Sequence, residues 1–278
     1  MLGKLLKHEF RATGRTMLPV LGVLAALVLV TNLFVRFGDQ LISRYQLAAV
    51  LFALIVAAAV IGVIAAEVMA IVVMVQRFYK NLLGDEGYLM HTLPVNVHEL
   101  VWSKLIVSLV WILATNLVIF LLGLASVVNL ADLSVGQIMA GFPSVEEIRR
   151  AMEEFGIRMS DLWVLGGEML LIILCGSLIT CLHFYAAMSL GHMFTQNKVL
   201  MSVVFFIGIN FLFNTLSGIL GTVSIQLNAE SFMEFTTALD GLRQMQAVLG
   251  SALGYSLLQG LILYIATTMS LQKGLNLA

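Results

Sequence analysis

The sequence predicts an all-α, polytopic membrane protein with six transmembrane helices, and two observations lead to this fold class. Of the 278 residues, 60% are hydrophobic and only 11% are charged, with a mean hydropathy of +0.99. A soluble domain is usually about a quarter charged, so these charges are too few to cover a water-facing surface. Apolar runs of the length that crosses a hydrocarbon core of about 30 Å recur along the chain.

Residues 1–16 predict an amphipathic helix lying at the membrane interface, before the first span. Leucines and a phenylalanine share one helical face of this stretch, while the basic residues share the other. We expect the basic face to contact anionic lipid headgroups. The membrane-interface residues of this face are Lys4, Lys7, Arg11 and Arg15, with His8 beside them.

The six spans are expected within one transmembrane domain that covers residues 1–278. They are Met17–Phe37, Leu47–Val75, Leu105–Val128, Met169–Met193, Val199–Leu220 and Leu249–Leu271. If the N-terminus is cytoplasmic, nine basic residues lie inside and six outside, and every lysine is inside. The positive-inside rule therefore predicts that both termini face the cytoplasm.

Three segments outside the spans have recognisable content. The outer segment 129–168 contains "PSVEEIRRAMEEF", in which Ser144 and Glu147 have capping-box spacing, so a short helix is expected there. The second outer segment, 222–248, is polar. The third segment, 76–104, is expected in the cytoplasm between the second and third spans.

Polar residues within the spans are candidates for function. Glu67 costs about 2.5–3.5 kcal/mol at the centre of a membrane, which the surrounding Leu, Ile and Val residues offset. It is therefore expected to face the helix bundle, either as a functional acid or as a protonated hydrogen-bonding group. The other intramembrane polar candidates are Asn116, His183, Asn210 and Asn214. Interhelical hydrogen bonding is the alternative role for these side chains.

Several catalytic motifs are missing from the sequence, and one weak match is present. The chain contains no P-loop, HExxH, paired CxxC or GxSxG motif. "EEFGIR", residues 153–158, fits the EExxxR pattern of CAAX-type intramembrane proteases, but it falls in a charged outer segment. We interpret this match as a solvated helix face, and expect neither a metal site nor an enzyme.

The cytoplasmic segment 76–104 is predicted to form an ordered elbow. Residues 84–87, Gly-Asp-Glu-Gly, have the composition of a turn, and Pro94 stops any helix that precedes it. Asn96 and Glu99 have the spacing that opens a new helix leading into the third span. Such an elbow is suited to docking into the groove of a partner, and an ordinary connecting loop is the alternative.

Two phrases in the sequence give the elbow a more specific interpretation. "MLGKLLKHEFRATGRTMLP" before a span, and "RFYKNLLGDEGYLMHTLPV" after the second, resemble the permease subunits of type-2 ABC exporters of Gram-positive bacteria. The resemblance implies a bacterial cell membrane location and a coupling segment that touches a separate ATPase subunit. Its residues here are Asp85, Glu86, Gly87, Tyr88, Met90, His91, Thr92, Leu93 and Pro94, with residues 195–198 as a lesser contact.

The resemblance also implies the partners and cofactors. No cofactor is expected on this chain, because ATP and Mg²⁺ would bind to the partner ATPase. A second permease copy or a sister permease, and the lipid bilayer, are the other expected partners, with no nucleic acid. The cargo is expected to be hydrophobic or amphipathic, such as a peptide or lipid. The alternatives are a proton-coupled secondary transporter that uses Glu67 and an intramembrane protease.

Overall fold

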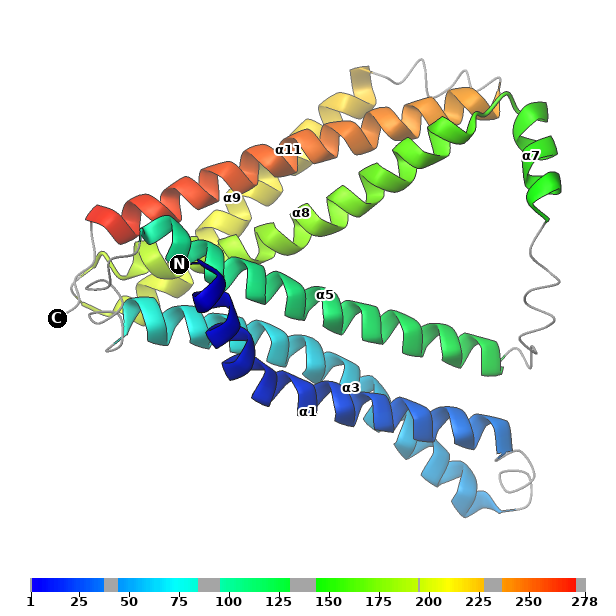
Figure 1. Cartoon of the computed structure of the whole chain (residues 1–278), viewed down its shortest axis with the longest axis horizontal. Helices are drawn as coiled ribbons and strands as arrows, with labels where there is room; N and C mark the ends of the chain where they lie inside the picture. Colours follow the sequence, from blue (N-terminus) through cyan, green and yellow to red (C-terminus); the bar gives the residue numbers. More distant parts are fainter. Residues whose placement is uncertain are drawn as a thin grey trace. The chain divides into compact units, whose positions relative to one another are not determined.

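The chain forms a set of long helices, described by a computed structural model over residues 2–37, 45–84, 96–130, 144–194, 196–227 and 237–273. Among these residues, six helices are long and apolar enough to cross a membrane, which confirms the predicted multi-pass α-helical fold class. The elements, shown in Figure 1, are α1 (Leu2–Phe37), α3 (Gln46–Phe78), the π-helical turn η1 (Tyr79–Leu83), α5 (Val97–Leu130), α7 (Val145–Glu154), α8 (Met159–Gly191), α9 (Lys198–Leu227) and α11 (Ala238–Lys273).

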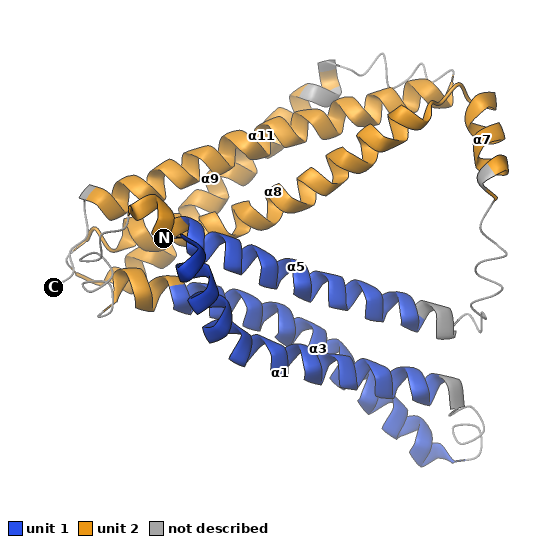
Figure 2. Cartoon of the chain, in the orientation of Figure 1, with its two compact units in different colours: residues 1–77, 102–142 blue, residues 78–101, 143–278 orange. Residues whose placement is uncertain are grey.

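Two compact units make up the chain (Figure 2). The first contains residues 1–77 and 102–142, and the second contains residues 78–101 and 143–278. The boundaries fall inside α3 and α5, so each of these helices contributes residues to both units. In particular, the two stretches that flank residues 85–95 both belong to the second unit.

The first unit is built from α1, α3 and α5. Small residues of α3 allow close packing: Ala70 meets Met17 of α1, and Ala66 meets Leu24 and Val28. Aliphatic residues of α5 complete this apolar core. Pro19 lies inside α1, where its missing N–H and its ring favour a kink, and α1 bends in its first half in Figure 1.

Residues 1–16, predicted as a separate amphipathic helix at the membrane interface, are helical and continue into the first span as one helix. The basic side chains predicted at the membrane interface, Lys4, Lys7, Arg11 and Arg15, are all exposed. Leu2, Leu5 and Leu6 are half-buried. Contact of the basic face with lipid headgroups stays a prediction.

The second unit is built around α8, along which α9 and α11 both pack (Figure 1). At the turn after α8, the helices approach closely enough that a Cβ on Gly191 would lie 2.5 Å from the backbone nitrogen of Ser202. Asn197 in this turn has a φ of 53°, which Asn tolerates better than most residues. The α8–α9 connection is therefore tight.

The short helix α7 has the predicted capping box. The Ser144 hydroxyl accepts a hydrogen bond from the Glu147 backbone N–H at 3.2 Å, and the Ser144 backbone N–H donates to the Glu147 carboxylate at 2.7 Å. The Ser144 hydroxyl also donates to this carboxylate, at 2.9 Å. The backbone and hydroxyl bonds to the carboxylate hold the pKa of Glu147 below its usual range, because they favour its charged form. The two Glu residues of the EExxxR match end this helix and are exposed.

Candidate functional site

The predicted coupling residues, from Asp85 to Pro94, lie outside the residues that the structure describes. The stretches on either side of them are described, and both make specific contacts in the second unit. These contacts determine where the segment is attached to the helices.

The first flank, at the end of α3, is attached to the C-terminal end of α8. Phe78 and Tyr185 are both fully buried, and their rings stack with centroids 3.9 Å apart. One residue further along, Tyr79 meets His192 edge-to-face at 5.2 Å. The π-helical turn then closes with a hydrogen bond from the Gly84 N–H to the Tyr79 carbonyl at 2.8 Å. Two successive aromatic contacts therefore hold this flank on α8.

The second flank, at the start of α5, is attached to α11. The helix begins at Val97, as predicted, and the Glu99 N–H donates to the Asn96 carbonyl at 2.9 Å. His98 Nδ1 lies 2.7 Å from the hydroxyl of Tyr264 on α11. Leu100 is buried on the same short stretch. Both ends of the segment are thus anchored, one on α8 and the other on α11.

His192, the partner of Tyr79, lies just past the end of the α8 span. Burial lowers the pKa of its ring, and the positive charge of Lys198 lowers it further, while a hydrogen bond to the Met188 carbonyl acts in the opposite direction. Burial therefore favours the neutral form of the ring in its contact with Tyr79.

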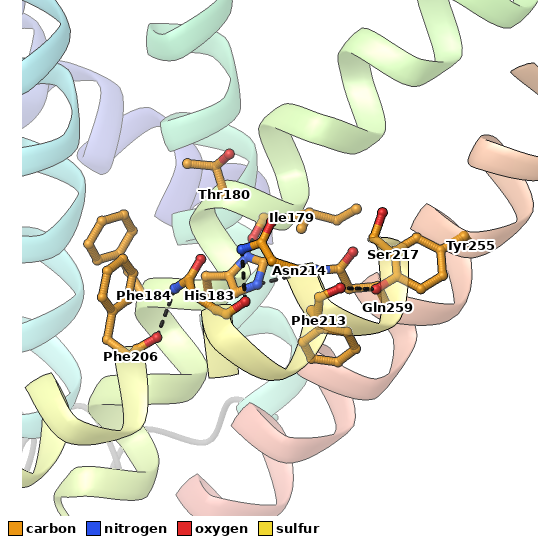
Figure 3. Close-up of a pocket in the computed structure, with 11 residues that line it drawn as sticks. Ile179, Thr180, His183, Phe184, Phe206, Phe213, Asn214, Ser217, Tyr255 and Gln259 are labelled. Carbon is orange, nitrogen blue, oxygen red and sulfur yellow. Dashed lines mark hydrogen bonds between the residues drawn. The ribbon is translucent and has the colours of Figure 1, made fainter. Parts of the chain in front are cut away.

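A polar cavity of about 260 Å³ lies between α8, α9 and α11 of the second unit. Figure 3 shows the side chains around it. The lining consists of Ile179, Thr180, His183, Phe184, Phe206, Asn210, Phe213, Asn214, Ser217, Tyr255 and Gln259.

Hydrogen bonds to backbone carbonyls determine how several of these polar groups are oriented (Figure 3). His183 Nδ1 lies 3.0 Å from the Ile179 carbonyl, which can only accept, so Nδ1 carries the proton. Its Nε2 then accepts from the Gln259 amide at 3.2 Å, which fits a neutral imidazole. The Tyr255 hydroxyl donates to the Phe213 carbonyl at 2.7 Å. This network links α8, α9 and α11.

Three of the five predicted intramembrane polar residues, namely His183, Asn210 and Asn214, therefore line one cavity. The other two belong to the first unit. Asn116 is exposed, and its amide donates to the Ile112 carbonyl at 2.9 Å. Glu67 is half-buried and makes no hydrogen bond or ion pair with any residue that the structure describes. Its predicted role is left open by this geometry.

A buried ion pair in the first unit was missed by the sequence reasoning. Glu9 of α1 and Lys104 of α5 form this pair, and each is about 3% exposed. Next to it, the Trp111 indole donates to the Thr13 hydroxyl at 2.8 Å. A signal was present, because Glu9 and Thr13 follow Leu5 at helical spacing and so fall on the half-buried face of α1.

Tyr255 and Gln259 of the cavity were also missed. Gln259 is 9% exposed, in a stretch that is otherwise almost wholly apolar, "SLLQGLILY". A single amide in such a run would have been a usable signal, by the reasoning that selected Asn210 and Asn214.

The described residues hold no group of three or more His, Cys, Asp or Glu side chains placed to bind a metal ion. The arginine of the EExxxR match, Arg158, contacts Asp161 at 3.8 Å, and Glu153 contacts Arg149 at 3.9 Å. No family model matches the chain, and neither a curated protein nor a solved structure matches it. The interpretation of the site therefore depends on its own geometry.

Proposed function

We propose that this chain is the membrane-spanning permease subunit of an ATP-driven exporter for hydrophobic or amphipathic cargo. ATP is hydrolysed by a separate ATPase subunit, and a second permease copy or a sister permease completes the assembly. The observation that carries this proposal is the attachment of residues 85–95 at both ends, to α8 through Phe78 and Tyr79 and to α11 through His98.

The attachment supports coupling because α8 and α11 also line the polar cavity. A partner that moves residues 85–95 would push on both helices through buried or hydrogen-bonded side chains. Packed elements transmit such a displacement as a rigid-body change rather than absorbing it.

The test is a pull-down of the tagged full-length protein from its native membrane. We expect the wild type to capture an ATPase and the double variant Leu93→Ser/Pro94→Gly to lose it. Ile148→Ser is the matched control, because Ile148 is 38% exposed on α7, in the predicted outer segment. A wild type that captures no ATPase, or a double variant that captures as much as the wild type, would overturn the proposal.

Glu67 supports a second candidate, a secondary transporter driven by a proton gradient. Its half-buried carboxyl has no hydrogen-bond or ion-pair partner among the described residues, so it is available to take up and release a proton. Uptake assays in liposomes separate the two candidates. Transport that follows an imposed pH gradient without ATP, and that is lost in Glu67→Gln, would favour the second.

A further inference from the structure

The polar cavity between α8, α9 and α11 has more hydrogen-bond acceptors than donors. The side-chain amide of Asn210 donates to the backbone carbonyl of Phe206 at 2.8 Å. The side-chain amide of Asn214 donates to the backbone carbonyl of Asn210 at 2.8 Å. Because a carbonyl can only accept, both NH₂ groups must face their own helix. The Gln259 NH₂ faces His183 Nε2 for the same reason, since Nδ1 of that ring carries the proton.

This arrangement leaves the three amide oxygens for a ligand. The side-chain oxygens of Asn210, Asn214 and Gln259 accept no hydrogen bond from the residues that the structure describes. Each oxygen has two lone pairs, whereas each NH₂ group has one N–H left. The cavity is therefore complementary to a ligand that mainly donates hydrogen bonds.

The amide oxygens of the cavity favour a positive charge on that ligand. Carbonyl oxygens can replace the hydration shell of a cation inside a membrane protein. The aromatic rings of the wall pack against neighbouring rings: Phe184 and Phe206 stack with centroids 4.6 Å apart, and Phe213 meets His183 edge-to-face at 6.0 Å. Among the residues that the structure describes, no Lys or Arg side chain lines the cavity to oppose a positive ligand.

We propose that this cavity binds the primary ammonium group of an amphipathic molecule. An ammonium has three N–H donors, which match the three amide oxygens. The volume of about 260 Å³ is large enough to hold an ammonium headgroup. The statement that this molecule is the cargo rests on the proposed function. The binding itself does not, because it requires no ATPase.

Binding is tested with the full-length protein in nanodiscs of phosphatidylglycerol, a lipid without an amine. The probe is radiolabelled dodecylammonium, with empty nanodiscs as background. Unlabelled dodecyltrimethylammonium, which has the same charge but no N–H, is the competitor. We expect it to compete at least about tenfold more weakly than unlabelled dodecylammonium, since a hydrogen bond to a charged group contributes about 1.5–3 kcal/mol. Equal competition would overturn the proposal.

Two variants and a matched control locate the site. Gln259→Leu is expected to weaken dodecylammonium binding about tenfold. Asn116→Leu should leave it unchanged, although Asn116, like Asn210 and Asn214, donates to a backbone carbonyl of its own helix. Asn214→Asp, which adds a negative charge, should tighten binding, and misfolding cannot produce such a gain.

Two results would show that dodecylammonium does not bind in this cavity. One is unchanged affinity in both Gln259→Leu and Asn214→Asp. The other is an Asn210→Leu variant that changes the oligomeric state but binds dodecylammonium normally, because its amide would then serve a contact between copies. A wild-type protein that binds dodecylammonium but captures no ATPase would instead contradict the proposed function alone.

Discussion

The two compact units have the same basic construction, three long helices, but they handle polar groups differently. In the first unit, the buried charges neutralise each other in the Glu9–Lys104 pair. Its larger cavity, about 430 Å³, is lined mostly by aliphatic side chains, and Asn32 donates there to Ser126 at 3.1 Å. In the second unit, amide oxygens instead surround a cavity whose described lining residues include no Lys, Arg, Asp or Glu.

This difference distinguishes polar groups that hold helices together from polar groups that are available to bind a ligand. A buried pair whose members satisfy each other fixes two helices but offers little to a ligand. Amides that bond only to their own helix leave their oxygens available. The second unit also contains both flanks of residues 85–95. The unit that has ligand chemistry is therefore the one attached to the predicted coupling segment.

The largest expected effect comes from breaking the ion pair of the first unit. Lys104→Met leaves Glu9 buried without its cation, which we expect to cost about 3–5 kcal/mol of unfolding free energy. Adding Glu9→Gln should recover much of this loss. Lys7→Met, which changes an exposed lysine of α1, is the control. The measurement is a double-mutant cycle on equilibrium unfolding in detergent, and equal stability of Lys104→Met and wild type would contradict the structural role.

The second unit should be most sensitive where α8 meets α9. Gly191→Ala places a Cβ about 2.5–2.6 Å from Ser202 backbone atoms, so the helices must move apart. Overpacking of this kind typically costs about 1–3 kcal/mol. Gly176→Ala in the same helix meets no atom within 4 Å and is the control. Thermal unfolding should separate the two variants clearly, and similar midpoints would mean that the turn is looser than described.

Local sequence signals predicted much of this fold. The six spans follow from hydrophobicity and length, and five of them lie within the observed helices, while the fourth ends just past Gly191. Capping chemistry located the start of α7, and Pro94 followed by Asn96 located the start of α5. These signals operate over a few residues, so a single sequence contains them completely.

The candidate site could be predicted only in part, because it depends on contacts between distant residues. His183, Asn210 and Asn214 stood out as polar residues in apolar runs, but nothing in the sequence placed them around one cavity with Gln259. Glu9 and Lys104 are 95 positions apart, and Phe78 meets Tyr185 only through tertiary packing. Periodicity identifies the face of a helix but not its neighbour.

The neutral ring of His192 predicts a moderate pH effect confined to the second unit. Because burial lowers the pKa of His192 in the native state, the unfolded chain binds the proton first as the pH falls through about 6.5. Stability should therefore decrease from pH 7 to pH 5.5. His192→Asn keeps a donor for the Met188 carbonyl but does not titrate, so it should reduce this slope. Unfolding midpoints at several pH values give the comparison, and an unchanged slope would exclude His192 as the cause.

The smallest expected effect is at α7, which lies outside the three packed helices of the second unit. Ser144→Ala removes the cap and should speed amide exchange in the first turn of α7 about fivefold, since such caps typically contribute about 1 kcal/mol. Exchange in α8 should not change. Glu146→Gln is the control, because its exposed pair with Arg150, at 3.5 Å, is expected to stabilise little. Faster exchange in both helices would mean that α7 and the packed helices open together. The cap would then stabilise the whole second unit and not α7 alone.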